Sequence, residues 1–122
     1  MALNYFLDTN IILYLLGGRL AESLPNGQYF TSIIVEMELR SYPSLTEQDE
    51  GHILNFLKDI TVVDLTEEVK EEAIRIRRLN STKLPDSIIV ATAQILNAKL
   101  LSNDIQLSKI LGINLQNVRL VE

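Results

Sequence analysis

Apolar residues along the chain follow two patterns that alternate from one end to the other. Short apolar runs rich in aromatic and β-branched residues predict strands at residues 4–8, 28–32, 60–65, 99–103 and 118–122. Longer stretches with apolar residues three and four positions apart predict helices at residues 9–16, 33–42, 47–59, 67–80, 85–97 and 104–111. Strands that alternate with helices are typical of an α/β domain around a mostly parallel sheet, here of four to five strands.

The expected helix starts carry residues that suit them. Thr46 and Thr66 are good N-cap residues, and Pro85 suits the first turn of the helix that follows it. The helix at 67–80 carries an apolar stripe of Val69, Ala73, Ile76 and Leu79. Two helices follow each other between the third and fourth strands, so the pattern leaves open whether one of them lies crosswise or protrudes.

One carboxylate interrupts the apolar run NYFLDTNIILYLL at residues 4–16. An unpaired ionised carboxylate in an apolar core costs far more free energy than one apolar contact contributes. We therefore expect Asp8 to lie near water, to pair with a cation, or to hold a metal ion.

Composition narrows the class of protein. The chain has 122 residues, 47% of them apolar, which suits one globular domain over residues 1–122. It contains no cysteine, which excludes disulfides and thiolate metal sites. No basic residue precedes the N-terminal apolar run, and residues 11–16 are too few to span a membrane. We expect a cytoplasmic protein with no membrane partner.

The net charge of −5 comes from 11 basic and 16 acidic residues. This balance argues against binding nucleic acid through a broad positive face. It does not exclude an enzyme that reaches phosphate through a bound cation. If four acids surround a metal ion, the remaining 12 nearly balance the 11 basic residues.

Three aspartates fall where a ligand site is expected. Ligands of open α/β sheets bind beyond the carboxyl ends of the strands, where Asp8 and Asp104 fall. Asp86 heads the apolar stripe of the helix at 85–97, so it should point inward from the first turn. The alternative for Asp86 is an ordinary first-turn acid that complements the helix dipole.

The second expected helix offers two glutamates, Glu36 and Glu38. They lie about 200° apart around the helix axis, so they cannot both face one point. Glu38 shares a face with Ile34 and Met37, which we expect to be the packed side. Glu36 stands four residues before Arg40, the spacing of an exposed ion pair. We assign Glu38 to the site and Glu36 to the surface.

Four converging carboxylates would need a cation between them. Each pair of charges about 5 Å apart, at an effective dielectric of about 20, costs about 3 kcal/mol. Oxygen ligands without thiolates or a histidine cluster point to Mg²⁺ or Mn²⁺. The only histidine, His52, lies in a polar helical stretch. Such a site can activate water and neutralise a phosphodiester, as metal-assisted phosphate-ester hydrolysis requires.

Four segments in order resemble the PIN domain family and, more narrowly, the VapC-type ribonuclease toxins: FLDTNIILYLL, TSIIVEMELRSYP, LPDSIIVATAQ and LLSND. The resemblance covers essentially the whole chain and implies a three-layer α/β/α sandwich. It also implies an acidic cluster, with matches at Asp8, Glu38, Asp86 and Asp104. Thr9 and Asn10 match polar positions beside the metal in the family, and a helix N-cap is the alternative for Thr9.

The chain departs from the family pattern around the last acid. Ser102 stands where the family usually has threonine, so a hydroxyl that positions water or metal is retained. The aromatic residue that often follows the last acid is absent, which leaves the substrate rim in doubt.

Basic residues concentrate just before Asp86, in the segment 70–83. These side chains are candidates to hold an RNA backbone through phosphate contacts: Arg75, Arg77, Arg78 and Lys83. The alternative is a solvated helix face with ordinary ion pairs.

The resemblance implies a Mg²⁺-dependent endoribonuclease, the toxin of a type II toxin–antitoxin pair. It further implies a homodimer, and neutralisation by a small antitoxin that places a basic side chain in the acidic site. Residues 11–16 and 45–80 are expected contact surfaces. Two alternatives stay open: a non-catalytic PIN-like binding module, and a phosphotransfer enzyme with Asp8 as nucleophile. Loss of an acid would indicate the first, and the second usually has an acid where this chain has Asn10.

Overall fold

The computed structural model describes residues 3–122, which form one five-stranded sheet. The strands are β1 (Asn4–Leu7), β2 (Gln28–Ser32), β3 (Thr61–Val63), β4 (Lys99–Leu101) and β5 (Leu115–Gln116). Their order in the sheet is β3-β2-β1-β4-β5, and each is parallel to its neighbours. The prediction of a parallel sheet of four to five strands is confirmed.

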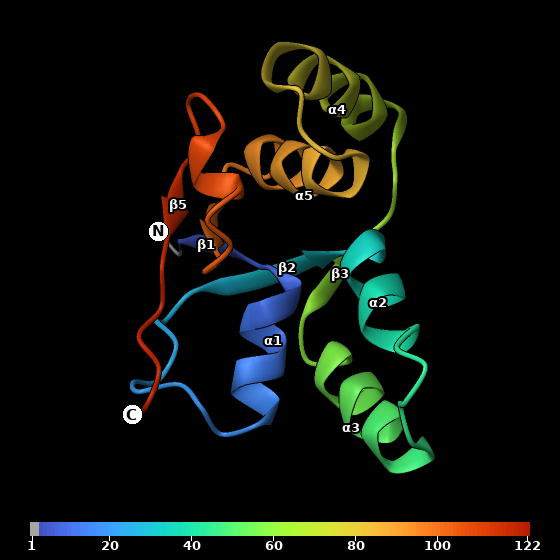
Figure 1. Cartoon of the computed structure of the whole chain (residues 1–122), viewed down its shortest axis with the longest axis vertical. Coiled ribbons are helices and arrows are strands. Elements are labelled where there is room, and N and C mark those ends of the chain that lie inside the picture. The colour runs from blue at the N-terminus through green and yellow to red at the C-terminus, as the bar shows by residue number, and fades with distance from the viewer. Residues whose placement is uncertain (1–2) are drawn as a thin grey trace.

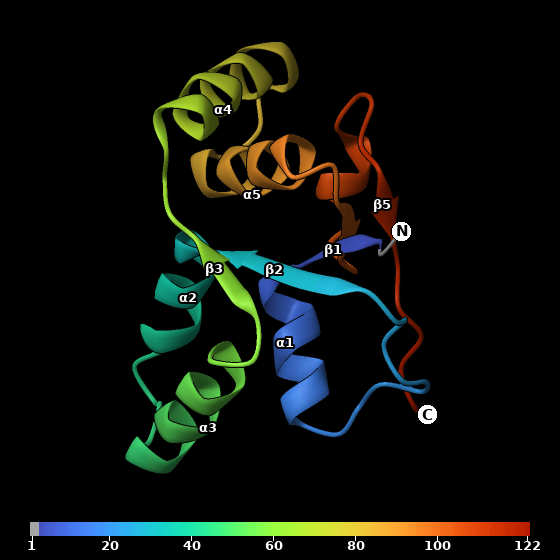
Figure 2. The same ribbon diagram turned by 180° about the vertical axis from the view of Figure 1, so that it is seen from behind.

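Helices cover both faces of this sheet. They are α1 (Thr9–Leu16), α2 (Ile33–Arg40), α3 (Glu47–Leu57), α4 (Glu67–Asn80) and α5 (Leu84–Ile95). Figure 1 shows α5 on one face with α4 stacked outside it, and α1, α2 and α3 on the other side; Figure 2 gives the view from behind. The three-layer prediction is confirmed. In the described part of the chain, no helix has the length and apolar character needed to cross a membrane.

β1 is the central strand, and its side chains form the middle of the core. Phe6 and Leu7 are fully buried, with β2 on one side and β4 on the other. Thr31 on β2 donates its hydroxyl proton to the Leu7 carbonyl at 2.8 Å. A parallel strand covered on both faces is expected to be a continuous apolar run, as this one is.

The packing of α4 on α5 resolves the connection that the sequence pattern left open. Residues 87–93 of α5 are at most 5% exposed, because the sheet covers one side of the helix and α4 the other. Val69, Ala73 and Ile76 of the predicted stripe are buried, but Leu79 is 66% exposed. The prediction for Leu79 is wrong because ten helical residues turn it about 80° away from Val69 around the axis.

The C-terminal region differs from the sequence prediction. The last strand is Leu115–Gln116, beside β4, whereas residues 118–122 contribute only an isolated antiparallel bridge between Leu20 and Leu120. The helix predicted at 104–111 is a 3₁₀ turn, Leu107–Lys109. The Asp104 carboxylate accepts the Gln106 N–H at 2.9 Å, a local bond that competes with helix formation.

Candidate functional site

Four carboxylates from separate parts of the chain line one pocket of about 190 Å³: Asp8, Glu38, Asp86 and Asp104. Asp8 follows β1 and Asp104 follows β4, which are neighbouring parallel strands. Glu38 comes from α2, which continues directly from β2, and Asp86 lies in the first turn of α5. The other walls of the pocket come from Thr9, Asn10, Leu13, Tyr42 and Ile89.

Asp8 is the most buried of the four, at 6% exposure. Its Oδ1 accepts the Thr9 N–H at 2.8 Å, and its Oδ2 accepts the Ser102 hydroxyl at 2.6 Å. Asp8 is therefore the N-cap of α1, and Thr9 is the first helical residue rather than the cap. Burial raises the pKa of Asp8, the two hydrogen bonds oppose this shift, and the charges of Asp104 and Asp86 add to it.

Ser102 connects two of the acids through its side-chain hydroxyl. Its buried hydroxyl donates to Asp8 and accepts the Asp104 N–H at 3.0 Å. The hydroxyl expected at this position therefore fixes the Asp8 carboxylate and the backbone of Asp104 relative to each other. Ser102 does not itself line the pocket.

Asn103 is a structural residue of the site that sequence reasoning missed. Its side chain donates to the Val118 carbonyl at 2.9 Å and accepts the Val118 N–H at 2.8 Å. Its own backbone N–H donates to Asn10 Oδ1 at 3.5 Å. These bonds tie the loop that carries Asp104 to the C-terminal segment, a pairing that no local pattern reveals.

Glu38 lies at the rim, where its Oε1 accepts the Thr9 hydroxyl at 3.2 Å. Burial raises the pKa of Glu38, the Thr9 hydrogen bond lowers it, and the charges of Asp8 and Asp86 raise it further. Asp86 has its pKa raised by burial and by Asp104, whereas the positive charge of Lys83 lowers it. The four predicted carboxylates thus line one pocket. The charges of Asp8, Asp86 and Asp104 each raise the pKa of at least one neighbouring acid in it.

Glu38 reaches the pocket, but the packing argument used to choose it was wrong. The buried residues of α2 are Val35 and Leu39, and Met37 is 59% exposed. β2 runs directly into α2, so the strand sets which side of the helix faces the core, and that side differs from the predicted one. Glu36 forms the predicted ion pair with Arg40 at 2.9 Å.

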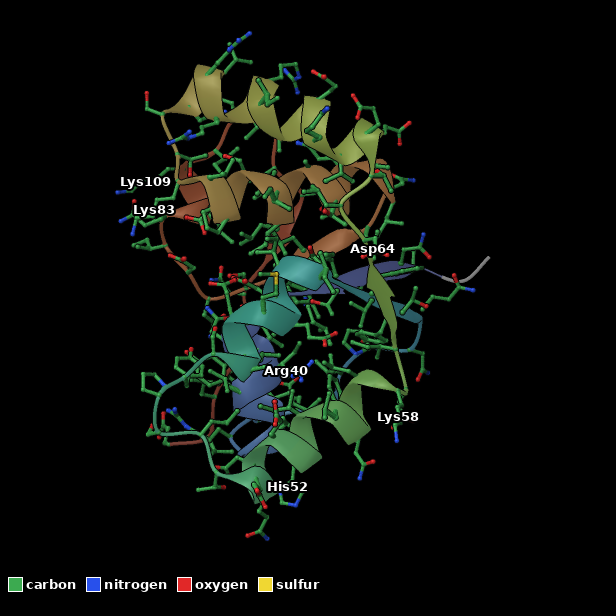
Figure 3. All side chains as sticks on the ribbon, turned by 90° about the vertical axis from the view of Figure 1, so that its right-hand side faces the viewer. Arg40, His52, Lys58, Asp64, Lys83 and Lys109 are labelled. Carbon is green, nitrogen blue, oxygen red and sulfur yellow. The ribbon has the colours of Figure 1, made fainter. Side chains whose placement is uncertain are left out.

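The basic residues predicted to contact substrate lie outside the pocket. Arg75 on α4 donates two hydrogen bonds of 2.6 and 3.0 Å to Glu72. For Arg75 the structure thus shows the alternative, an ordinary ion pair on a helix face. Arg77 and Arg78 are exposed in the last turn of α4. Lys83 is the N-cap residue of α5 and carries its charge near Asp86. Figure 3 shows Lys83 and Lys109 on one side of the molecule. Their contact with a substrate stays a prediction.

The donor set fits a hard divalent cation such as Mg²⁺ or Mn²⁺. All four acids offer oxygen ligands, and none of them forms a salt bridge within the described residues. A cation would offset the burial and repulsion that raise the pKa of Asp8, Glu38 and Asp86. In residues 3–122, no three His, Cys, Asp or Glu side chains already have an arrangement that could hold a metal ion. Binding would therefore have to draw these side chains closer together.

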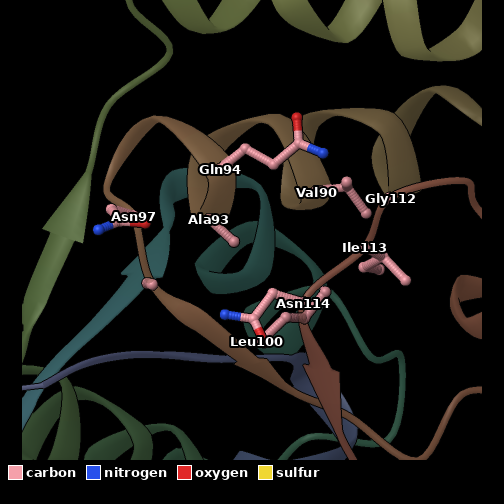
Figure 4. A pocket seen from close by; sticks show the side chains of 9 residues that line it. Val90, Ala93, Gln94, Asn97, Leu100, Gly112, Ile113 and Asn114 are labelled. Atoms are coloured by element: carbon pink, nitrogen blue, oxygen red, sulfur yellow. The ribbon is translucent and has the colours of Figure 1, made fainter.

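A second cavity, also of about 190 Å³, lies between α5 and the segment before β5 (Figure 4). Its lining consists of apolar side chains, Gly112 and three amides, Gln94, Asn97 and Asn114. It contains no titratable side chain, so it offers no acid–base or metal chemistry. The carboxylate pocket is the candidate site.

The fold and this pocket define an α/β protein with an acidic site at the carboxyl ends of parallel strands. The chain belongs to the PIN domain family, whose model matches residues 5–112. A comparison with curated proteins finds no significant sequence match.

Several solved structures have a similar fold, among them a toxin–antitoxin complex and two VapBC structures. A chain of VapBC2 from Rickettsia felis, bound to a promoter DNA fragment, is 23% identical with a TM-score of 0.80, covering 96% of this chain and 100% of that one. A toxin–antitoxin complex from Klebsiella pneumoniae gives 26% identity and a TM-score of 0.75, covering 92% and 95%. VapBC-1 from nontypeable Haemophilus influenzae gives 24% and 0.74, covering 94% and 98%. The fold implied by the sequence resemblance is therefore confirmed.

Proposed function

We propose that this protein is a Mg²⁺-dependent endoribonuclease, the VapC-type toxin of a type II toxin–antitoxin pair. The observation that carries the proposal is the pocket in which four carboxylates of a PIN fold meet. The similarity to chains of toxin–antitoxin complexes supports the toxin role. A non-catalytic module would not need four acids whose mutual repulsion costs stability.

Asp8, Glu38, Asp86 and Asp104 would hold one or two Mg²⁺ or Mn²⁺ ions. When bound, the metal supplies charge stabilisation at the scissile phosphate and lowers the pKa of an attacking water. Ser102 and the Thr9 N–H orient Asp8, and Thr9 orients Glu38. Glu38 lies at the exposed rim with a raised pKa, so it is our choice to take the proton of the water.

The residues around Asp8 argue against a phosphotransfer role. Such enzymes usually carry a second acid two residues after the nucleophile, where this chain has Asn10. Asp8 instead shares its pocket with Glu38, Asp86 and Asp104, a set of oxygen ligands suited to a cation.

The substrate and partners follow from the same proposal. Lys83, beside Asp86, and the exposed Arg77 and Arg78 are proposed to contact RNA phosphates, which positions the strand without reading its sequence. A small antitoxin would insert one basic side chain among the acids, and the exposed apolar residues Leu13 and Leu16 of α1 are proposed contacts for it. We further propose a cytoplasmic homodimer. A pull-down that recovers no small co-encoded protein would contradict the toxin role but not the nuclease.

Cleavage of a mixed RNA pool by the purified protein tests the nuclease directly. We expect cutting with Mg²⁺ or Mn²⁺, and none with EDTA, because the acids alone cannot neutralise the phosphate. Isothermal titration with Mn²⁺ in the absence of RNA provides a second readout. Cutting that persists in EDTA would contradict the metal assignment, and absence of both cutting and metal uptake would contradict the enzyme.

Two glutamates on one helix allow a matched comparison. Glu38→Gln is expected to lower the cleavage rate and Mn²⁺ affinity by about 10- to 100-fold, because it removes a charge from the pocket. Glu36→Gln loses only the surface pair with Arg40 and should leave both unchanged. RNA cleavage rates and Mn²⁺ affinities from calorimetry, measured for both variants, test whether Glu38 belongs to the site. Equal effects from the two changes would remove Glu38 from the proposed site.

A further inference from the structure

One aromatic side chain of this protein has no place in the core. The chain has seven Phe and Tyr residues, all within the described part. Six of them belong to the core or pack against it: Tyr5, Phe6, Tyr14, Tyr29, Phe30 and Phe56. Tyr42 is the exception: it is 43% exposed and lines the pocket of the four carboxylates. Tyr42 therefore presents an exposed aromatic surface at the acidic pocket.

The backbone beneath Tyr42 is held firmly. Ser41 ends α2 with its hydroxyl bonded to the Met37 carbonyl, and its N–H donates to the Glu38 carbonyl at 3.4 Å. The Tyr42 carbonyl accepts the Leu45 N–H at 3.1 Å, which closes a turn that contains Pro43. Proline restricts its own φ and the conformation of the residue before it. The ring therefore projects from a fixed point on the pocket wall.

The lining of the pocket has an acidic part and an apolar part. The carboxylates provide a place for cations and, through them, for a phosphate. Leu13, Ile89 and Tyr42 make the apolar part, and of these Leu13 and Tyr42 are substantially exposed, at 38% and 43%. After Asp104 the chain has the aliphatic Ile105 rather than an aromatic residue. Among residues 3–122, Tyr42 is thus the aromatic side chain that lines this pocket.

We propose that Tyr42 is the stacking surface for an unpaired nucleobase next to the scissile phosphate. A base inside a duplex is stacked on both faces by its neighbours, so its face cannot meet an aromatic side chain. A base of a single strand can leave the stack and lie on a tyrosine ring, whatever its identity. This inference rests on the proposed ribonuclease function.

Tyr42→Trp provides a direct probe, because the chain contains no tryptophan. The protein would keep all four carboxylates, and a ten-nucleotide single-stranded RNA of mixed sequence would be titrated with Ca²⁺ in place of Mg²⁺, so that a cation is bound while cleavage is slowed. Stacking on the indole is expected to quench its fluorescence in a saturable way. A hairpin RNA duplex of the same composition should quench at least tenfold more weakly. Equal quenching by duplex and single strand would overturn the inference.

Three further variants separate stacking from structure. Tyr42→Ala is expected to weaken binding of the oligonucleotide and raise KM by about tenfold, with kcat little changed. Tyr42→Phe keeps the ring and should restore binding to within about twofold. Met37→Ala, on the exposed side of α2, which ends just before Tyr42, is the matched control and should have no effect. Unchanged KM in Tyr42→Ala would contradict the stacking role.

Cleavage and fluorescence together distinguish failure of the ribonuclease proposal from failure of the Tyr42 stacking proposal. Metal-dependent cleavage with no response to changes at Tyr42 leaves the nuclease and removes the stacking surface. Quenching by single-stranded RNA, with no cleavage by the wild-type protein in Mg²⁺ or Mn²⁺, keeps the stacking surface and removes the nuclease. No RNA binding by fluorescence and no cleavage would remove both.

Discussion

Asp8→Asn is expected to lower metal-dependent RNA cleavage by at least about a thousandfold. Asp8 is the most buried carboxylate of the pocket and has two hydrogen bonds that orient it. The charge stabilisation that a bound metal supplies is worth several kcal/mol, and each 1.4 kcal/mol changes a rate about tenfold. Initial rates of cleavage of the mixed RNA pool, measured at saturating Mg²⁺ for the wild type and the variant, give the effect directly.

Asp64→Asn is the matched control for this change. Asp64 directly follows β3, as Asp8 follows β1, but it is exposed and does not line the pocket. It should cleave at the wild-type rate. Because asparagine at position 8 alters the bond with Ser102, thermal melting must first establish that the variant is folded. A folded Asp8→Asn protein that cleaves at the wild-type rate would contradict the proposed metal site.

Much of the fold could be predicted because its signals are local. The apolar period distinguishes strands from helices, and Thr46 and Thr66 cap α3 and α4 as expected. In a parallel sheet all carboxyl ends lie at one edge, so residues that follow neighbouring strands, as Asp8 and Asp104 do, lie close together. For this reason the meeting of Asp8 and Asp104 was predictable without coordinates.

Other features depend on contacts that the local sequence does not encode. Whether Glu38 or Glu36 reaches the pocket depends on the phase of α2 against the core, which Val35 and Leu39 set. The exposure of Tyr42 depends on which side chains surround it, and the sequence RSYP indicates only the end of a helix. The position of the last strand follows from pairing with β4 at Leu115, which competed with a more apolar segment further on.

We expect the Asp86 carboxylate to lower the stability of the metal-free protein and to be required for RNA cleavage. Its pKa is raised by burial and by Asp104, so the folded protein holds this proton to higher pH than the unfolded chain does. Stability is therefore lost as the pH rises from the usual aspartate pKa, near 4, through the raised value. In EDTA the wild type should melt at a higher temperature at the low end of this window than at pH 7.

Asp86→Asn removes this charge and should stabilise the metal-free protein at pH 7. With allowance for screening at a partly exposed group, we expect about 0.5 to 1 kcal/mol, or roughly 2–5 °C in Tm. The same change should lower cleavage by about a thousandfold, because a ligand is lost. The wild type should gain about 2.7 kcal/mol when Mg²⁺ is present at about 100 times its Kd, and the variant almost nothing.

Thermal melts of both proteins, at pH 7 with EDTA and with Mg²⁺, measure these quantities, with Asp64→Asn as the control. A metal-free Asp86→Asn protein less stable than the wild type would mean that Asp86 is a structural residue of α5 rather than a charge kept for a cation. The opposite result, higher stability with lost cleavage and lost response to Mg²⁺, is the behaviour of a ligand. The raised pKa of this carboxylate would then reflect burial and repulsion from Asp104, which Lys83 offsets only in part and which a bound ion would relieve further.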